Sequence, residues 1–157
     1  VGSPLHLYHH PQTQFVAGFI GSPKMNFLSA RVTEVGPENT QIMLESGRVI
    51  SAAIDSSSLE KGAHVQLGLR PEHMSVTCDE NTLEGKITLV EHLGEQSYLY
   101  VDIQQEGEFV LKVDGDNQYQ AGDNVTFGIK PNSLYLFNHQ GHALPRVNSN
   151  LETKPLP

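Results

Sequence analysis

The sequence predicts a mainly β protein in which two similar small barrels follow one or two short helices. Residues 62–71 return as residues 122–131, with Gly, Val, Gly and Pro at matching places. Each copy alternates apolar and polar side chains, as one strand with a buried face does. A repeat near sixty residues is too long for a propeller blade or a solenoid unit and suits a small barrel. Short strands with glycine-rich turns favour five-stranded Greek-key barrels of the OB type.

The expected helices precede the barrels. Ser3 and Pro4 are suited to the N-cap and first turn of a helix that we expect to end near His9. A second helix is expected from Pro11 to Gly21. So short a helix is stable only when its apolar face packs against something. That face consists of Phe15, Phe19 and Ile20.

Alternating apolar residues predict the strands of both barrels. In the first they fall within 28–32, 42–44, 65–69 and 74–78, and in the second within 83–87, 99–103, 109–113, 125–129 and 134–136. Residues 83–87 echo residues 28–32, so the repeat extends to the first strand of each module. We therefore expect a helical part over 1–24, modules over 25–80 and 81–140, and a flexible tail over 141–157.

Composition restricts the functions available to this chain. It carries 18 acidic residues against 10 Lys and Arg, a formal charge of −8, which disfavours a nucleic-acid partner. The single cysteine, Cys78, excludes an internal disulfide and indicates a reducing compartment. It falls in step with Met74 and Val76, which predicts a buried structural thiol. No apolar run approaches the roughly 20 residues of a membrane-spanning helix. Because the chain begins at Val1, we expect a fragment of a longer protein.

No catalytic constellation is found in the sequence. The only Gly-Lys pair, Gly85 and Lys86, is followed by Ile87 where a phosphate-binding loop needs Ser or Thr. No Ser or Cys stands in a nucleophile motif. Two histidine groups invite a zinc hypothesis, but surface positions at a helix junction and in a turn are the favoured interpretation. These groups are His6, His9 and His10, and His139 and His142.

Two stretches resemble a known family. Residues 15–28 (FVAGFIGSPKMNFL), followed by residues 68–73 (GLRPEH), resemble the C-terminal part of the ATP-binding subunits of ABC sugar importers, most closely those of the maltose/maltodextrin type. The resemblance extends to about Phe137. It implies that the chain holds the end of the nucleotide-binding domain, a connecting helix and a regulatory domain of two OB-like, TOBE-type modules. It also implies that the complete subunit is an ATPase that drives sugar import.

The resemblance further implies what this chain does and does not do. The ATP and Mg²⁺ sites would precede Val1, so we expect no cofactor or metal in this fragment and no ATP hydrolysis by it. The expected partners are a second copy in a homodimer, the membrane subunits reached through the ATPase domain, and a regulatory protein such as a phosphotransferase component or a transcription activator. The location implied is cytoplasmic, on the inner face of the cell membrane.

The resemblance also suggests roles for particular residues. The interdomain hinge would comprise Gly21, Ser22, Pro23, Met25 and Asn26, and the face of Phe15, Phe19 and Ile20 would pack against another domain or form a dimer contact. Arg70 and Glu72 would tie the end of their strand to the neighbouring module. The repeated motif to which they belong comprises Gly68, Arg70, Pro71 and Glu72 in one copy and Gly128, Lys130 and Pro131 in the other. Because Lys130 and Asn132 replace Arg70 and Glu72, the pair of charges occurs only once.

Two other functions remain open from the sequence. Tandem OB-like modules also occur in molybdate-binding proteins, where an oxyanion would be held by backbone amides and Ser or Lys between modules. A nucleic-acid-binding OB module is less favoured. It would use Tyr98, Tyr100 and Tyr135 as stacking platforms.

Overall fold

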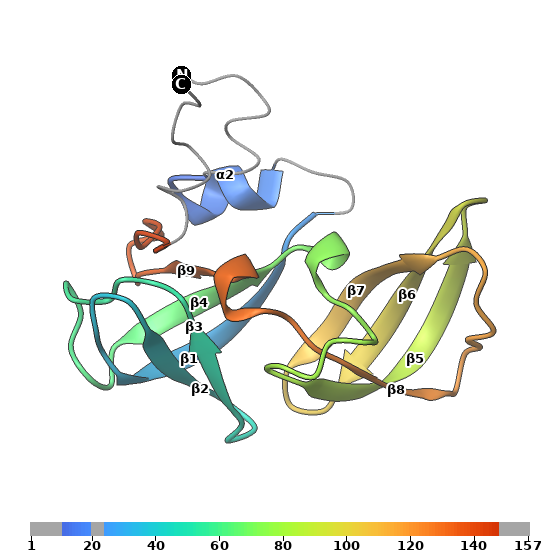
Figure 1. The fold of residues 1–157 in the computed structure, drawn as a ribbon, viewed down its shortest axis with the longest axis horizontal. Helices are drawn as coiled ribbons and strands as arrows, with labels where there is room; N and C mark the ends of the chain where they lie inside the picture. Colours follow the sequence, from blue (N-terminus) through green and yellow to red (C-terminus); the bar gives the residue numbers. More distant parts are fainter. Residues whose placement is uncertain (1–10, 20–23, 148–157) are drawn as a thin grey trace.

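The computed structural model describes residues 11–19 and 24–147 and contains two curled antiparallel sheets that form OB-like half-barrels (Figure 1). One short helix, α2 (Gln14–Phe19), precedes them. The predicted fold class is therefore confirmed. The helix expected over residues 3–9 lies outside the described residues. Of the flexible tail expected over 141–157, residues 141–147 instead pair with the first sheet, and the remainder lies outside the described residues.

Each sheet is built mainly from one half of the chain. The first has the order β3-β2-β1-β4-β9 and consists of β1 (Asn26–Glu34), β2 (Thr40–Leu44), β3 (Val49–Ala52), β4 (His64–Leu69) and β9 (Tyr135–Phe137). The second has the order β7-β6-β5-β8 and consists of β5 (Leu83–His92), β6 (Gln96–Ile103), β7 (Gly107–Asp114) and β8 (Asn124–Phe127). Two short 3-10 helices, η1 (Pro71–His73) and η2 (Pro131–Ser133), follow β4 and β8.

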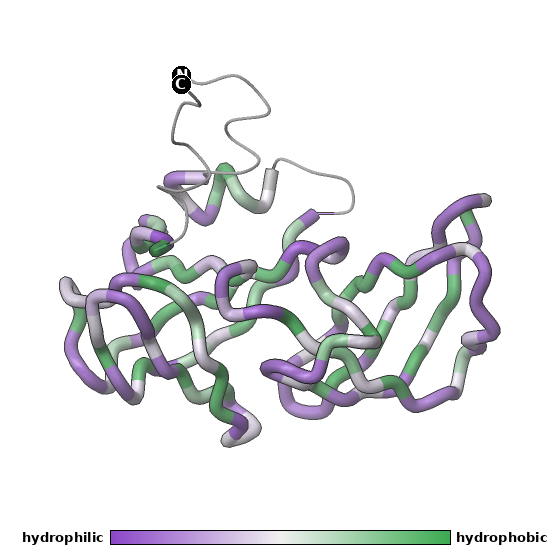
Figure 2. The backbone as a smooth tube through the Cα atoms, in the orientation of Figure 1, coloured by the Kyte–Doolittle hydropathy of each residue, from purple (hydrophilic) through white to green (hydrophobic). Residues whose placement is uncertain are grey.

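One hydrophobic core runs through both sheets. Most of the residues predicted to face inward are buried, although Val76, Cys78 and Val113 are half-buried. The buried residues of both modules belong to a single cluster that includes Leu67, Leu99 and Phe127. Figure 2 shows apolar and hydrophilic positions alternating along the strands, as the sequence predicts. The glycine before each repeated strand has the positive φ expected of it, +88° at Gly62 and +97° at Gly122.

The chain crosses between the two sheets in both directions, once as a strand and once through a single β-bridge. β9, which follows β8 in the chain, pairs with β4 of the first sheet, where Tyr135 lies opposite Gly68. In the reverse direction, Ser75 leaves the first module and pairs with Gly128 at the end of β8. Gly128 and Tyr135 each lie sixty positions after Gly68 and Ser75 respectively, so the two crossings are copies of each other. The module expected over 81–140 therefore contributes its last strand, β9, to the first sheet, and the strand expected over 74–78 is reduced to a single pairing.

The crossings explain why the repeat keeps its glycines. A Cβ on Gly128 would lie 2.5 Å from the carbonyl oxygens of both Cys78 and Glu80. A Cβ on Gly68 would meet the side chains of Met25, Phe137 and Tyr135. Each glycine thus allows the incoming segment to approach the strand end. The proline three positions later begins the 3-10 helix that redirects the chain to the other sheet.

Cys78 differs from its predicted environment. The chain turns at residues 76–77 instead of continuing as a strand, so the alternation that would have buried the thiol ends. The side chain is half-buried, and its sulfur lies 3.8 Å from the carbonyl oxygen of Glu80.

Gly128→Ala should lower the free energy of unfolding by about 1–3 kcal/mol, because the new methyl group meets fixed backbone oxygens. Gly68→Ala should cost less, since flexible side chains surround that position. Urea denaturation measures both, with Thr126→Ala on the exposed side of β8 as the control. A Gly128→Ala protein as stable as the control would show that the crossing does not require close approach.

Candidate interdomain face

Two asparagine side chains join the sheets. The side chain of Asn26, at the start of β1, accepts a hydrogen bond from the backbone N–H of Val110 in β7 at 3.0 Å and donates to the Val110 carbonyl oxygen at 3.1 Å. It also donates to the carbonyl oxygen of Leu69 in its own sheet at 3.3 Å. One amide therefore satisfies the exposed edge of β7 and links it to the end of β4.

Asn81 makes the same contacts in the opposite direction. Its side chain accepts from the N–H of Ser51 in β3 at 3.0 Å and donates to the Ser51 carbonyl oxygen at 2.9 Å. It also donates to the carbonyl oxygen of Ile129 at 3.1 Å. Asn81 has a φ of +48°, a conformation that asparagine tolerates better than most residues. The crossings and both asparagines thus follow one approximate two-fold relation between the modules.

The sequence prediction placed Asn26 in a hinge and did not identify Asn81. The signal was present, because each asparagine lies two residues before the first leucine of its module, Leu28 and Leu83. What the sequence did not show was the partner of each amide, which is the edge strand of the other sheet. Of the other hinge residues, Met25 is buried beneath α2, whereas residues 21–23 lie outside the described residues.

The repeated motif has different environments in its two copies. Arg70 is fully buried, and its guanidinium donates to the carbonyl oxygen of Ala17 in α2 at 3.3 Å. Burial lowers the pKa of Arg70, and the neighbouring Tyr135 partly offsets this effect. Lys130 at the equivalent position is exposed, as is Glu72. The first copy therefore anchors the helix, whereas the second ends in solvent. Pro71 is buried and Pro131 is half-buried, each at the start of its 3-10 helix.

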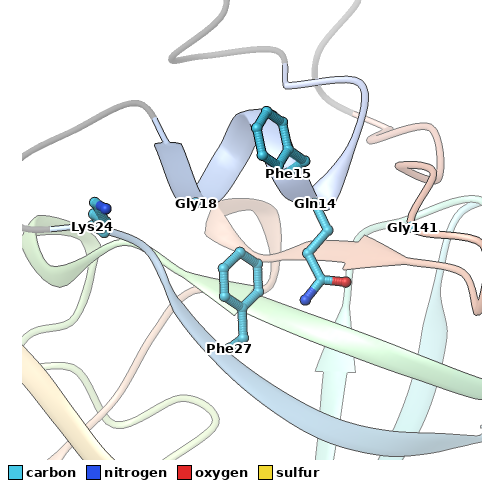
Figure 3. Close-up of a pocket in the computed structure, with 6 residues that line it drawn as sticks. All are labelled: Gln14, Phe15, Gly18, Lys24, Phe27 and Gly141. Atoms are coloured by element: carbon cyan, nitrogen blue, oxygen red, sulfur yellow. The ribbon is translucent and has the colours of Figure 1, made fainter.

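Helix α2 packs on a small apolar cluster at the end of the first sheet. Ala17 is buried against Met25, Tyr135 and Phe137, with Phe27 at the margin. The rings of Phe27 and Phe137 meet edge to face with centroids 6.0 Å apart. Figure 3 shows Phe27 pointing from β1 toward the helix at Gly18, where no Cβ intervenes. The helix therefore contacts the sheet through its small residues.

Only Phe15 of the expected packing face, which comprises Phe15, Phe19 and Ile20, has a described side chain, and it is exposed. Phe15 is 78% exposed and lines a surface hollow of about 530 Å³ together with Gln14, Lys24 and Phe27 (Figure 3). The side chain of Phe19 and all of Ile20 lie outside the described residues. A contact of Phe15 with another domain or subunit remains a prediction. The adjoining apolar surface is continuous with the cluster under the helix.

The surface equivalent to the apolar cluster under α2, at the other crossing, is polar. Met25 and Phe27 flank Asn26 at the start of β1. Glu80 and Thr82 flank Asn81 in the same way just before β5. Tyr135 and Phe137 correspond to Ser75 and Thr77. Glu80 and Thr77 are exposed, whereas Met25, Tyr135 and Phe137 are at most 5% exposed. One backbone arrangement therefore occurs twice, with an apolar surface at one end only.

Two backbone amides between the modules, which an oxyanion site could have used, already have partners. The backbone N–H groups of Ser51 and Val110, which face the other module, already donate to Asn81 and Asn26. Lys130 is exposed at the start of η2. Among the residues that the structure describes, no three His, Cys, Asp or Glu side chains are grouped to hold a metal ion. His139 and His142 lie at a turn, as the sequence suggested, and residues 6–10 are outside the described part.

Tyr135 is not available as a stacking platform for nucleic-acid bases. Tyr135 is 3% exposed, and the guanidinium of Arg146 lies 4.2 Å from its ring centroid, so the stacking role considered for it is excluded by burial. Tyr100 is half-buried and donates to the carboxylate of Glu91 at 3.4 Å. Burial and this carboxylate raise the pKa of Tyr100. A neighbouring carboxylate would repel phosphate groups.

Comparisons with known proteins identify the domain type. The MalK OB fold domain family matches residues 21–74, and the TOBE domain family matches residues 67–137. The chain belongs to the TOBE-type, tandem OB-like domains of the MalK family. The two matches overlap across β4 and the first crossing, where the sheets exchange segments.

Similar curated proteins carry the name maltose/maltodextrin import ATP-binding protein MalK. The protein from Photobacterium profundum is 37% identical over 149 residues, which are 94% of this chain and 40% of that protein. The one from Vibrio cholerae serotype O1 is 37% identical over 150 residues, with the same coverage. The one from Yersinia pestis bv. Antiqua (strain Antiqua) is 37% identical over 153 residues, 96% of this chain and 42% of that protein. The chain thus spans about 40% of the length of these relatives.

A solved structure shares the fold at low sequence identity. The cytoplasmic molybdate-binding protein ModG, in a molybdate-bound crystal form, superposes with a TM-score of 0.61 over 71% of this chain and 94% of the ModG chain. The sequences are 17% identical, so the likeness concerns the fold alone.

Replacing either asparagine of this TOBE-type domain by aspartate should lower the free energy of unfolding by about 2 kcal/mol at neutral pH. A carboxylate keeps the acceptor but faces two carbonyl oxygens, which raises its folded pKa above the ordinary value of about 3.9. The loss should therefore be complete above the raised pKa and should shrink as pH falls below it.

Urea unfolding of Asn26→Asp and Asn81→Asp between about pH 3.5 and 7.5 tests this expectation. Asn124→Asp, on an exposed residue of β8, is the control. If all three variants share one pH dependence, the asparagine contacts do not hold the sheets together.

Proposed function

We propose that this chain is the regulatory and dimerisation part of the ATP-binding subunit of a maltose/maltodextrin-type ABC importer, and that its apolar end is where it joins the ATPase domain. The proposal rests on a difference between the two equivalent crossings: the residues at one crossing are apolar, whereas those at the other are polar. Met25, Phe27, Tyr135 and Phe137 gather under α2, while their counterparts are Glu80, Thr82, Ser75 and Thr77.

Folding alone does not require one crossing to be apolar, so the difference favours a role in attachment to another domain. A module that only had to fold could use the polar surface at both ends, since the second end is formed by the same backbone crossing. The apolar end is covered in part by α2, and Phe15 extends the apolar surface outward at 78% exposure. Exposed aromatic groups beside an apolar hollow are typical of interaction sites. The chain that precedes β1 also enters the sheet at this end.

ATP hydrolysis would belong to the preceding domain. Gly85 and Lys86 lie inside β5, and a Cβ on Gly85 would meet Val101 and the backbone of Asp102, so this pair forms no phosphate-binding loop. Gly85 and Lys86 therefore do not provide a site for the phosphates of ATP. In the complete subunit, the present chain would transmit regulatory contacts and hold two copies together.

The proposed setting is the inner, cytoplasmic face of the cell membrane. The membrane subunits would be reached through the ATPase domain, and a phosphotransferase component or a transcription activator would be the regulatory partner. The similarity to MalK proteins supports this placement. Within the described residues, no helix is long and apolar enough to cross a membrane.

The test uses the full-length protein encoded by the same gene, with Phe15→Asp as the variant. The gene should encode a Gly-x-x-x-x-Gly-Lys-Ser/Thr loop before Val1. Because Phe15 is exposed in this chain, the substitution should leave the urea stability of the 157-residue chain unchanged. In the full-length protein it should speed proteolysis between the two domains or weaken the dimer measured by sedimentation velocity.

Met43→Asp provides a matched control, since Met43 is 41% exposed on β2, away from the hollow. It should not affect proteolysis or sedimentation. A start codon directly before Val1 would remove the ATPase setting altogether. A full-length Phe15→Asp protein that behaves as the Met43→Asp protein would instead refute only the assignment of the attachment face.

A further inference from the structure

The open edge of the first sheet is covered by the chain itself. After β9 the chain returns along residues that follow β3, where Asp55 donates its N–H to the Pro145 carbonyl oxygen at 2.9 Å and Ala53 accepts from the N–H of Val147 at 3.1 Å. Leu144 is 6% exposed and belongs to the main core. Residues 143–147 thus form an extended covering segment with a buried leucine. Figure 1 shows this red segment beside the first sheet only.

The second sheet has a region equivalent to the one that residues 143–147 cover on the first sheet. Matching hydrogen bonds in the two modules define it. Val32 donates to the carbonyl oxygen of Ala63 at 3.0 Å and accepts from Gly62 at 2.7 Å. Ile87 donates to Asp123 at 2.8 Å and accepts from Gly122 at 2.7 Å. The loops before β4 and β8 are therefore equivalent.

This equivalence assigns to each residue around the covered region of the first module a counterpart in the second module. Leu59 and Leu136 of the first region correspond to Tyr119 and Val76 of the second, each sixty positions away. The matched contacts of Ser51 and Val110 with the two asparagines align β3 with β7. That alignment makes Val113 the counterpart of Ile54.

The equivalent region of the second module is open. Val76, Val113 and Tyr119 line a surface hollow of about 510 Å³, and all three are half-buried. Their counterparts Ile54 and Leu136 are fully buried under the covering segment. Within residues 11–19 and 24–147, no segment takes the position over Val113 that residues 143–147 take over Ile54. The core of the second module therefore reaches the surface where the first is sealed.

The edge of β7 at this hollow can accept another strand. Both backbone groups of Val110 point away from β6 toward Asn26, so alternation along the strand places the N–H of Asp114 on the same outer edge. The carbonyl oxygen of Asp114 accepts from the Asn117 side chain at 2.6 Å. Asp114 is the counterpart of Asp55, whose N–H binds Pro145 in the first module.

The rim of the hollow is acidic. Asp114, Asp116 and Asp123 line it, and all three are exposed. The carboxylate of Asp123 also accepts the N–H of Gln120 at 2.9 Å. A ligand for this hollow therefore needs an apolar group for the floor and a positive charge for the rim. The covering segment of the first module has that order, with Leu144 followed by Arg146.

We propose that the hollow between β7 and residues 116–123 binds an extended segment of a partner protein in which an apolar residue is followed by Lys or Arg. The segment would pair with the outer edge of β7 at Asp114, bury its apolar side chain against Val76, Val113 and Tyr119, and direct its base toward the aspartates. This is strand addition to an open edge, with specificity from one pocket and one charge. The inference goes beyond the proposed function and does not depend on it.

The test titrates the 157-residue chain with a capped peptide of the sequence Gly-His-Ala-Leu-Pro-Arg-Val, which copies residues 141–147. Amide chemical shifts in the NMR spectrum should change at residues 112–119 and 76, with a dissociation constant on the order of 0.1–1 mM for one apolar anchor and a short strand. Replacing the peptide leucine by aspartate should abolish these shifts.

Asp116→Lys should weaken the peptide about fivefold or more, because an attractive charge becomes repulsive. Glu38→Lys makes the same change of charge at an exposed site in the first module and should have no effect. No shifts at residues 112–119 with the peptide at millimolar concentration would overturn the proposal, as would shifts confined to residues 53–55. Self-association of the chain that covers residues 112–119 without peptide would also overturn it, because the occupant would then be a second copy.

Discussion

Two reciprocal chain crossings hold the described structure together. Each sheet gives its following segment to the other, and an asparagine beside each crossing binds both backbone groups of the other module's edge strand. Both sheets also share one core. Neither barrel is complete without residues from the other half, because β9 covers β4 and residues near Ser75 close on β8. The relative position of the modules is therefore a consequence of folding and not of a flexible linker.

The duplicated sequence forms two crossings with different surfaces and two sheet edges of which only one is covered. The backbone keeps the two-fold relation, while the side chains depart from it in places that bear on function. Arg70 is buried under α2, whereas Lys130 is exposed. The apolar cluster below the helix has only polar counterparts. The segment with Leu144 seals the first module, whereas the equivalent hollow near Val113 is open. Departures from the repeat therefore mark the candidate interaction surfaces.

The sequence predicted the strands well because their residues alternate and because the repeat fixes the turns. Leu28, Ile42, Leu99 and Phe127 are buried as expected, and the resemblance to the importer family was confirmed by the comparisons. The exchange of strands was not predictable in the same way. Alternation specifies which face of a strand is buried but not which sheet it joins, so residues 134–136 were expected to close their own module.

The candidate site was predicted less completely for a related reason. An aromatic residue on a short amphipathic helix suggests a packing face, yet α2 packs through Ala17 and Gly18 and leaves Phe15 exposed. Close approach of helix and sheet favours small residues, a preference that hydrophobicity alone does not reveal. The role of Asn26 depends on a partner 84 positions away and that of Asn81 on a partner 30 positions away, which a single sequence does not indicate.

Differential scanning calorimetry of the 157-residue chain tests the central claim, that the two modules form one cooperative unit. If the reciprocal crossings bind the sheets into one core, the chain should melt in a single transition whose calorimetric and van't Hoff enthalpies agree. Two separate transitions, or a calorimetric enthalpy about twice the van't Hoff value, would mean that the modules unfold independently and would contradict this account.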